Sequence, residues 1–197
     1  MASKDRILRL KEETRNNILD AACTIVKEEG WQGLSLRKIA DAIEYTAPII
    51  YEYFANKEAI LQELTKKGYL VLNKDLIQAK KSKDNPAEQL EAMWLAYWKF
   101  AFENKEMYQL MFGVEMTTCH MVAFPEVQTP YHLFTETILE VMGDKNPDED
   151  IICQKYYTYY SVVHGLISIN LVGNGLPNDI NLQILKDAIT GITRSLN

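Results

Sequence analysis

Residues 35–54 read SLRKIADAIEYTAPIIYEYF, and this stretch decides the fold. Ser35 is the expected N-cap of a short helix, because a serine hydroxyl accepts a hydrogen bond from a first-turn backbone N–H. The apolar residues that follow recur at the three- and four-residue spacing of a helix: Leu36, Ile39, Ala40 and Ile43. Thr46 and Pro48 predict a second short helix, running to about Phe54, since proline is tolerated in a first turn. Two short helices three or four residues apart predict a helix-turn-helix, although a plain corner of a helical bundle has the same spacing.

Longer amphipathic segments flank this pair. Residues 12–29 carry apolar side chains at helical spacing, with Thr14 as a candidate cap and Gly30 as the end. Asn56 opens a second long helix, which we expect over residues 56–80. The helix-turn-helix therefore lies between two longer helices.

The remaining chain is also predicted to be helical. Residues 86–104 are apolar nearly all round, so their helix is expected to be buried and dense in aromatic side chains, Phe102 included. Asn146 and Pro147 mark the start of a helix that ends at Gly173. The other expected segments are residues 105–113, 114–124, 127–142 and 179–196. The predicted fold class is all-α, with about nine helices.

The composition is that of a globular protein. The chain has 197 residues, 47% of them apolar, and three cysteines too far apart for a disulfide framework. No window approaches the roughly 20 apolar residues of a membrane span, and the first residues lack the apolar run of a signal peptide. We therefore expect a cytoplasmic protein without a membrane partner.

The formal net charge of −6 is unevenly distributed. Residues 1–83 hold 15 Lys and Arg against 12 acidic side chains, a net of +3, whereas residues 84–197 hold 6 against 15, a net of −9. Because phosphates attract only the nearby cations, the acidic total does not exclude a nucleic-acid partner for the N-terminal part.

Residues 12–62 resemble the N-terminal signature of the tetracycline-repressor (TetR) family of bacterial transcription regulators. The matching residues, in order and spacing, are Thr14, Arg15, Ile18, Leu19, Ala21, Ala22, Gly30, Leu36, Ile39, Ala40, Tyr51, Tyr53, Phe54, Lys57, Glu58 and Leu61. The resemblance implies a DNA-binding domain over residues 1–56 and a ligand-binding and dimerisation domain over residues 57–197. It also implies a homodimer on a palindromic double-stranded operator, usually a repressor relieved by a small-molecule effector.

The candidate DNA-binding residues follow from this resemblance. They are Thr14, Ser35, Arg37, Lys38, Tyr45, Thr46, Ala47, Pro48, Tyr51, Tyr53 and Lys57. By resemblance Tyr51 and Lys57 reach the DNA backbone, whereas Thr14, Arg37 and Lys38 are candidates because helix N-termini favour phosphate. Arg37 and Lys38 are alternatively plain solvated side chains.

The turn and the recognition helix depart from the family pattern. Glu44 stands where the family usually has glycine, and Tyr45 replaces a valine. A left-handed backbone at Glu44 would cost about 1–2 kcal/mol. Asn, Gln and Arg, the usual readers of base edges, are absent from the start of the helix, so we expect Tyr45, Thr46 and the apolar Ala47 and Pro48 to read bases.

Basic residues also precede the first expected helix. Lys4, Arg6, Arg9 and Lys11 form an arm that either enters the minor groove or is disordered.

The second candidate site is an effector pocket rich in methionine and aromatic side chains, which adapt to apolar or aromatic ligands. Its candidate residues are Met93, Trp94, Tyr97, Met107, Met111, Phe112, Met116, Phe124, Tyr157, Tyr160 and His164. Core packing is the alternative role for each, and a histidine satisfied inside the bundle is the alternative for His164. Residues 163–166, Val-His-Gly-Leu, resemble a Trp-His-Gly subtype of the family, with Tyr160 in place of the Trp and Gly165 read as a close helix crossing.

The last two helices are the expected dimer surface, since such a pair forms a four-helix bundle with its partner's copy. Their alternative role is to close a monomer core. No P-loop, GxGxxG, GxSxG or HExxH motif is present, so neither an enzyme nor a cofactor is expected. Cys119 and His120 diverge by about 100° on a helix, so no metal site is expected either. The alternative function is a helical small-molecule-binding or carrier protein whose helix-turn-helix does not read DNA, in keeping with Glu44 and Glu52.

Overall fold

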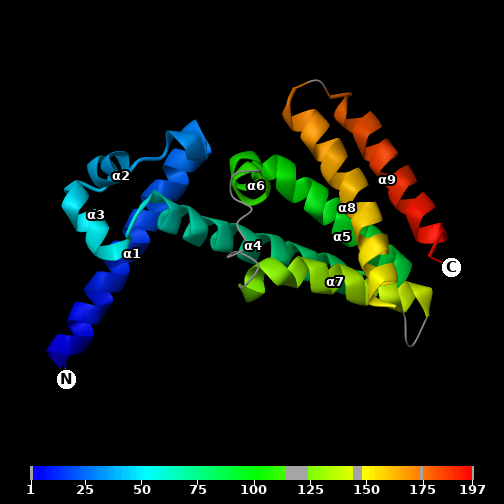
Figure 1. The fold of residues 1–197 in the computed structure, drawn as a ribbon, viewed down its shortest axis with the longest axis horizontal. Helices are drawn as coiled ribbons and strands as arrows, with labels where there is room; N and C mark the ends of the chain where they lie inside the picture. Colours follow the sequence, from blue (N-terminus) through cyan, green and yellow to red (C-terminus); the bar gives the residue numbers. More distant parts are fainter. Residues whose placement is uncertain (1, 114–123, 144–147, 174, 197) are drawn as a thin grey trace. The chain divides into compact units, whose positions relative to one another are not determined.

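The computed structural model describes residues 2–113, 124–143, 148–173 and 175–196, and these residues form helices and no strand. The elements are α1 (Ala2–Glu29), the 3₁₀ turn η1 (Trp31–Gly33), α2 (Leu36–Ala42), α3 (Ala47–Tyr53), α4 (Lys57–Lys81), α5 (Pro86–Glu103), α6 (Lys105–Phe112), α7 (Pro125–Met142), α8 (Glu149–Leu171) and α9 (Asn178–Arg194) (Figure 1). The predicted all-α fold is confirmed.

The chain folds into two compact units. Among the described residues, unit 1 comprises the chain up to Gly68 together with residues 106–113, and unit 2 comprises Tyr69–Lys105 and the chain from Phe124 onward. Helix α4 contributes its first half to unit 1 and its second half to unit 2.

Unit 1 is built around the buried stripe of α1. Its fully buried side chains recur at helical spacing: Ile18, Leu19, Ala22 and Val26. They form a core with Ile39 of α2 and Ile50 of α3, neither of which is exposed at all. Gly30, at φ 77°, ends α1 in a backbone conformation that favours glycine, as predicted. The core fixes α2 and α3 beside α1 (Figure 1).

Helix α1 starts at Ala2, ten residues before the predicted start. The prediction was wrong because core-facing periodicity begins only near Ile18, whereas residues 2–11 contain no glycine or proline and continue the helix without being buried. Thr14 therefore lies inside α1 and not at a helix N-terminus, and its hydroxyl donates to the Leu10 carbonyl at 2.9 Å. The reason for assigning Thr14 to a phosphate is removed.

Unit 2 packs α5 against α7, α8 and α9 (Figure 1). The predicted burial of α5 is confirmed for Leu90, Met93, Trp94, Tyr97, Trp98, Phe100 and Ala101. Phe102 is the exception, because it is exposed on the outer side of the helix. Asp148 caps α8 by accepting from the Asp150 N–H at 3.0 Å. The predicted start at Asn146 and the predicted helix over residues 114–124, except Phe124, lie outside the described residues.

No helix in the described ranges combines the length and apolar character needed to cross a membrane.

Candidate functional site

Two caps define the helix-turn-helix and the helix after it. Ser35 Oγ accepts a hydrogen bond from the Lys38 N–H at 3.2 Å, as the sequence predicted. Asn56 Oδ1 accepts from the Ala59 N–H at 2.9 Å and fixes the start of α4. Thr46 occupies the N-cap position of α3, but its hydroxyl makes no capping bond. Thr46 is exposed at the start of α3.

The turn between α2 and α3 contains a left-handed glutamate. Glu44 has φ 58°, the one positive φ of a non-glycine among the described residues. The Tyr45 N–H donates to the Ala40 carbonyl at 2.9 Å and closes the turn behind it. The backbone at Glu44 is thus left-handed, at a cost of about 1–2 kcal/mol.

Helix α3 buries one face and exposes the other. Ile50 is fully buried, whereas Tyr51 is 57% exposed and Tyr45, just before the helix, is 42% exposed. Thr46 and Pro48 are also exposed, while Ala47 and Tyr53 are half-buried. The predicted base-reading residues therefore lie together around the N-terminus of α3.

The predicted phosphate-binding cations differ in their surroundings. Lys38 forms an ion pair with Glu29. Lys57 Nζ donates to the Gln32 carbonyl at 3.2 Å and lies 5.9 Å from the centre of the Trp31 ring. Arg37 is exposed on α2. Lys57 thus ties the start of α4 to η1, a role that its spacing in the sequence did not reveal.

Arg15 has a structural role that sequence reasoning missed. Its guanidinium lies 5.0 Å from the centre of the Phe54 ring and pairs with Glu63 at 3.1 Å. Burial opposes ionisation of Glu63, but hydrogen bonds from Lys66 and Arg15 hold the pKa of its carboxyl below the ordinary value. Arg15 therefore fastens α1 to the end of α3 and to α4.

A shallow groove of about 290 Å³ runs between α1 and the C-terminal end of α3. Its lining residues are Lys11, Glu12, Arg15, Glu52 and Tyr53. The groove places the N-terminal part of α1 next to the recognition helix.

Unit 2 contains an aromatic cluster, defined here as Trp94, Tyr97, Phe134, Tyr156, Tyr159, Tyr160 and His164. Trp94 stacks on Phe134 at 3.8 Å and on Tyr159 at 5.7 Å between ring centres. Tyr160 stacks on His164 at 5.1 Å. The structure thus brings together the predicted residues Trp94, Tyr97, Tyr160 and His164. Tyr156 and Tyr159 of α8 were not among the predicted site residues.

The aromatic cluster is electrically neutral at pH 7. Burial raises the pKa of Tyr156 and of Tyr160, and it raises the pKa of Tyr159 to about 12. Burial lowers the pKa of His164. The indole Nε1 of Trp94 is buried and has no hydrogen-bond partner among the described residues.

Other predicted effector residues lie elsewhere. Met107 and Met111 on α6 belong to unit 1, where a Cβ at Gly68 would lie within 3.0 Å of their side chains. Phe112 and Phe124 are half-buried, and Met93 is buried in the core of unit 2. Tyr157 is 53% exposed. Met116 lies outside the described residues.

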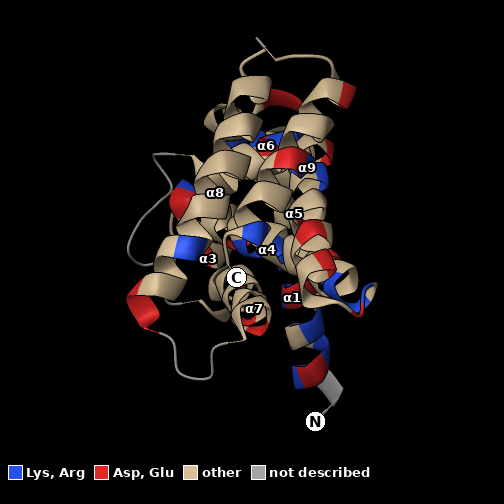
Figure 2. Ribbon diagram, turned by 90° about the vertical axis from the view of Figure 1, so that its right-hand side faces the viewer, with Lys and Arg blue, Asp and Glu red and all other residues tan. Residues whose placement is uncertain are grey.

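Helices α8 and α9 expose an apolar face. Its large side chains are Tyr157, Val162, Ile169, Ile180 and Ile184, together with Val172 directly after α8. Residues 156–171 contain no charged side chain, which leaves most of the α8 ribbon uncoloured by charge (Figure 2). An added Cβ at Gly165 or at Gly191 would meet no described atom within 4 Å. Gly165 therefore marks no close crossing with a described helix of its own chain, contrary to the prediction.

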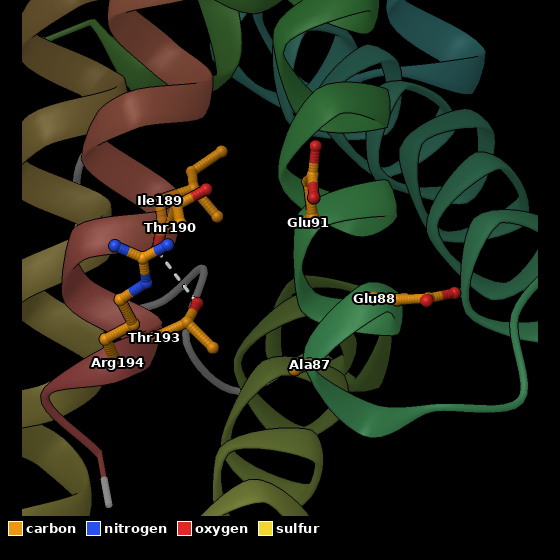
Figure 3. A pocket seen from close by; sticks show the side chains of 7 residues that line it. All are labelled: Ala87, Glu88, Glu91, Ile189, Thr190, Thr193 and Arg194. Atoms are coloured by element: carbon orange, nitrogen blue, oxygen red, sulfur yellow. Dashed lines mark hydrogen bonds between the residues drawn. The ribbon is translucent and has the colours of Figure 1, made fainter.

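A second groove, of about 280 Å³, lies between α5 and α9 (Figure 3). Arg194 and Thr190 line it from α9, and Glu91 faces them from α5 (Figure 3). None of these residues was predicted as a site residue. Within the described part of the chain, no three His, Cys, Asp or Glu side chains gather closely enough to hold a metal ion.

Two family profiles match the chain. The profile described as bacterial regulatory proteins, tetR family, matches residues 18–64, which include α2 and α3. The profile described as tetracyclin repressor-like, C-terminal domain, matches residues 90–189.

Curated relatives match over part of their length. The biofilm operon icaADBC HTH-type negative transcriptional regulator IcaR of Staphylococcus aureus (strain Newman) is 26% identical over 98 residues, which are 50% of this chain and 51% of IcaR. The HTH-type transcriptional activator FasR of Mycolicibacterium smegmatis is 21% identical over 133 residues, which are 68% of this chain and 60% of FasR. The match thus spans about half of IcaR and somewhat more of FasR.

Solved structures share the fold. A protein of unknown function from Rhodococcus sp. RHA1 has a TM-score of 0.76 and 21% identity, over 92% of this chain and 94% of that one. At this identity the likeness shows the fold alone.

Proposed function

The chain belongs to the tetR family of bacterial regulatory proteins, and from that membership we propose that it is a DNA-binding transcriptional repressor controlled by a small molecule. The family is one of regulators and not of enzymes. IcaR is named a negative regulator and FasR an activator, and repression is the direction we propose for this chain.

One observation carries the proposal: the exposed side of the capped helix-turn-helix. Tyr45, Thr46 and Pro48 lie exposed at the N-terminus of α3, while Ile50 anchors the helix in the core. A recognition helix reads base edges with its N-terminal residues. We assign base contacts to Tyr45, Thr46, Ala47 and Pro48.

Backbone contacts come from residues at the edges of this surface. Tyr51 extends a phenol from α3 and is well suited to a phosphate oxygen. Lys57 at the start of α4 and Arg37 on α2 complete the set of phosphate contacts, since helix N-termini favour phosphate. Lys57 must exchange its bond with the Gln32 carbonyl for a phosphate, whereas Lys38 must leave Glu29. These contacts position the head and carry no sequence information.

Substitutions in α3 test the assignment on a pool of random duplexes. Thr46→Ala should change the sequence that is enriched, because it removes a base contact. Tyr51→Phe should weaken binding to all duplexes alike, because it removes a phosphate contact. Lys74→Ala, at an exposed lysine in the middle of α4, is the control and should leave both unchanged. Unchanged duplex binding by both α3 variants would reject the proposed DNA surface. Failure of the wild type to bind any duplex would instead favour the carrier function.

We propose that two chains associate through the apolar face of α8 and α9. The exposed Ile169, Val172 and Ile180 lack apolar neighbours that would cover them within the described chain. A Cβ added at Gly165 or Gly191 would meet no described atom within 4 Å, and glycine in a helix permits a second backbone to approach. Two heads related by the resulting two-fold axis would read half-sites about 34–36 Å apart, or a multiple of this, on palindromic DNA.

We propose an uncharged aromatic effector for unit 2. The neutral aromatic cluster offers ring faces and tyrosine hydroxyls, and the unpaired Trp94 Nε1 favours a ligand with a hydrogen-bond acceptor. Tyr160 stacked on His164 supports assignment to the Trp-His-Gly subtype, with Tyr160 in place of the Trp. Quenching of tryptophan fluorescence by neutral phenols, lost in Trp94→Phe, tests the site; carboxylates should quench less.

Helix α4 is the proposed connection between effector and DNA. We keep Lys57, its first residue, as the boundary between the DNA-binding domain and the rest of the chain. Because α4 continues from unit 1 into unit 2, an effector that favours one orientation of the helix changes the spacing of the two heads. An effector without such a preference would leave DNA binding unchanged.

A further inference from the structure

We propose that the N-terminal end of α1 is a second DNA-binding surface, in which Lys4 and Lys11 contact phosphates outside the half-site read by α3. This inference rests on the proposed DNA-binding function and adds to it a contact with flanking DNA.

The first turns of α1 are helical without being packed. Residues 4–13 are all exposed, and the first fully buried side chain of α1 is Ile18. Arg9 Nε donates to the Asp5 carbonyl within the same helix, at 3.4 Å. About 15 Å of helix therefore carries no core contact, a length that is marginal on its own in water. A surface of this kind is explained by a partner that covers it.

The cations of this segment fall on two faces. At about 100° per residue, Lys4 and Lys11 are about 20° apart around the helix, and Arg15 is about 40° from Lys11. Arg6 is displaced from Lys4 by about 160° and lies on the opposite side. Lys4 and Lys11 therefore share the face of Arg15.

This face is the one beside the recognition helix. Lys11 and Arg15 line the groove that Glu52 and Tyr53 of α3 close on the other side. Figure 1 shows α1 passing α3 and continuing beyond it to the N-terminus. Arg15 is held by Glu63, whereas Lys4 and Lys11 are exposed and form no ion pair among the described residues. The surface around Lys4 is thus continuous with the proposed DNA-binding face.

Charge and composition favour a nucleic acid as the partner. Residues 4–11 hold four cations, Lys4, Arg6, Arg9 and Lys11, against one acid, Asp5. The acids Glu12 and Glu52 line the groove, whereas Asp5 is the one acid in residues 4–11, so the attraction for phosphate increases toward the N-terminus. A duplex presents one charge for about every 1.7 Å of its axis, so several phosphates face this length of helix. Ile7 lies between the two lysines in the sequence, and apolar side chains of this kind are inserted between base steps by minor-groove binders.

A basic helix with exposed Ile7, Leu8 and Leu10 also fits an anionic membrane surface. Continuity with α3 favours DNA, and the membrane becomes an outcome of the test.

The experiment measures the salt dependence of operator binding by the full chain. Two duplexes carry the same recovered operator: one ends at the half-sites, and the other adds about one helical turn on each side. The double variant Lys4→Ala/Lys11→Ala is compared with the wild type, and Arg6→Ala, on the opposite face of the same segment, is the matched control. Alanine preserves helix propensity at these exposed positions, and circular dichroism checks the fold.

The proposal predicts that the wild type binds the longer duplex more tightly. The double variant should lose this gain. On the longer duplex, its slope of the logarithm of the binding constant against the logarithm of the salt concentration should decrease in magnitude by about 3.6, because two phosphate contacts in each of two heads contribute about 0.9 each. On the short duplex the double variant should bind with the wild-type affinity and salt slope. The Arg6→Ala variant should match the wild type on both duplexes. A wild-type slope in the double variant, or equal loss in Arg6→Ala, overturns the proposal. The proposal is also overturned if the double variant loses binding to phosphatidylserine vesicles while its operator binding is unchanged. Failure of the wild type to bind any duplex would instead reject the proposed function itself.

Discussion

Replacing Gly165 and Gly191 together by alanine tests whether α8 and α9 meet a second chain. Both glycines lie inside helices, where glycine is less favourable than alanine by about 0.5–1 kcal/mol. A Cβ at either position meets no described atom within 4 Å. Within a single chain the double substitution should therefore raise the free energy of unfolding by about 1–2 kcal/mol.

The proposed dimer predicts an effect of opposite sign on association. If the glycines admit the partner's helices, the added methyl groups intrude into a packed interface, where overpacking costs about 1–3 kcal/mol. The two-fold axis repeats each substitution, so we expect the dissociation constant of the dimer to rise at least about tenfold, which corresponds to 1.4 kcal/mol. The variant should thus be a more stable monomer and a weaker dimer.

Sedimentation equilibrium gives the dissociation constant, and urea unfolding at two protein concentrations gives the stability of each state. Gly68→Ala is the control, because its Cβ would lie 2.5 Å from Met111 Sδ within unit 1. It should destabilise the chain and leave the dissociation constant unchanged. A Gly165→Ala/Gly191→Ala variant that gains stability with an unaltered dissociation constant would refute the proposed interface.

Three further substitutions test single features of the structure. Glu44→Gly removes the strain of a left-handed glutamate and should raise the free energy of unfolding by about 1 kcal/mol in urea denaturation, with glycine's own entropy offsetting the rest; lower stability would contradict the assigned backbone. Ser35→Ala should lower the free energy of unfolding by about 1 kcal/mol through loss of the cap to Lys38, whereas Ser82→Ala, between α4 and α5, serves as the comparison outside the head. Because burial lowers the pKa of His164 in the folded state, the unfolded chain binds a proton there first as the pH falls, and the stability of the fold should decrease below about pH 6.5. In melting experiments at several pH values, His164→Gln should show a smaller decrease than the wild type. An identical pH profile for the two proteins would argue against a buried neutral imidazole.

Sequence reasoning recovered the elements whose signals are local. Ser35 and Asn56 mark the starts of their helices by capping, and Gly30 ends α1 at a positive φ. Glu44 was recognised as a departure from glycine, and its positive φ confirms that the turn demands the same backbone. Each of these depends on one residue and its immediate neighbours.

Features that depend on distant partners were missed. No spacing in the sequence connects Lys57 to the Gln32 carbonyl, or Arg15 to Phe54 and Glu63. The first turns of α1 were missed for another reason: amphipathic periodicity reports burial, and these turns are helical while exposed. The aromatic cluster was found only in part, because Phe134 reaches Trp94 from a different helix.

The most direct test of the central claim is the selection of bound sequences from a random duplex pool by the full chain at two salt concentrations. The account predicts recovery of a palindrome, with two chains per duplex and half-site centres about 34–36 Å apart or a multiple of it, bound less tightly at the higher salt concentration. Recovery of no palindrome, or an affinity that does not change with salt, would contradict it.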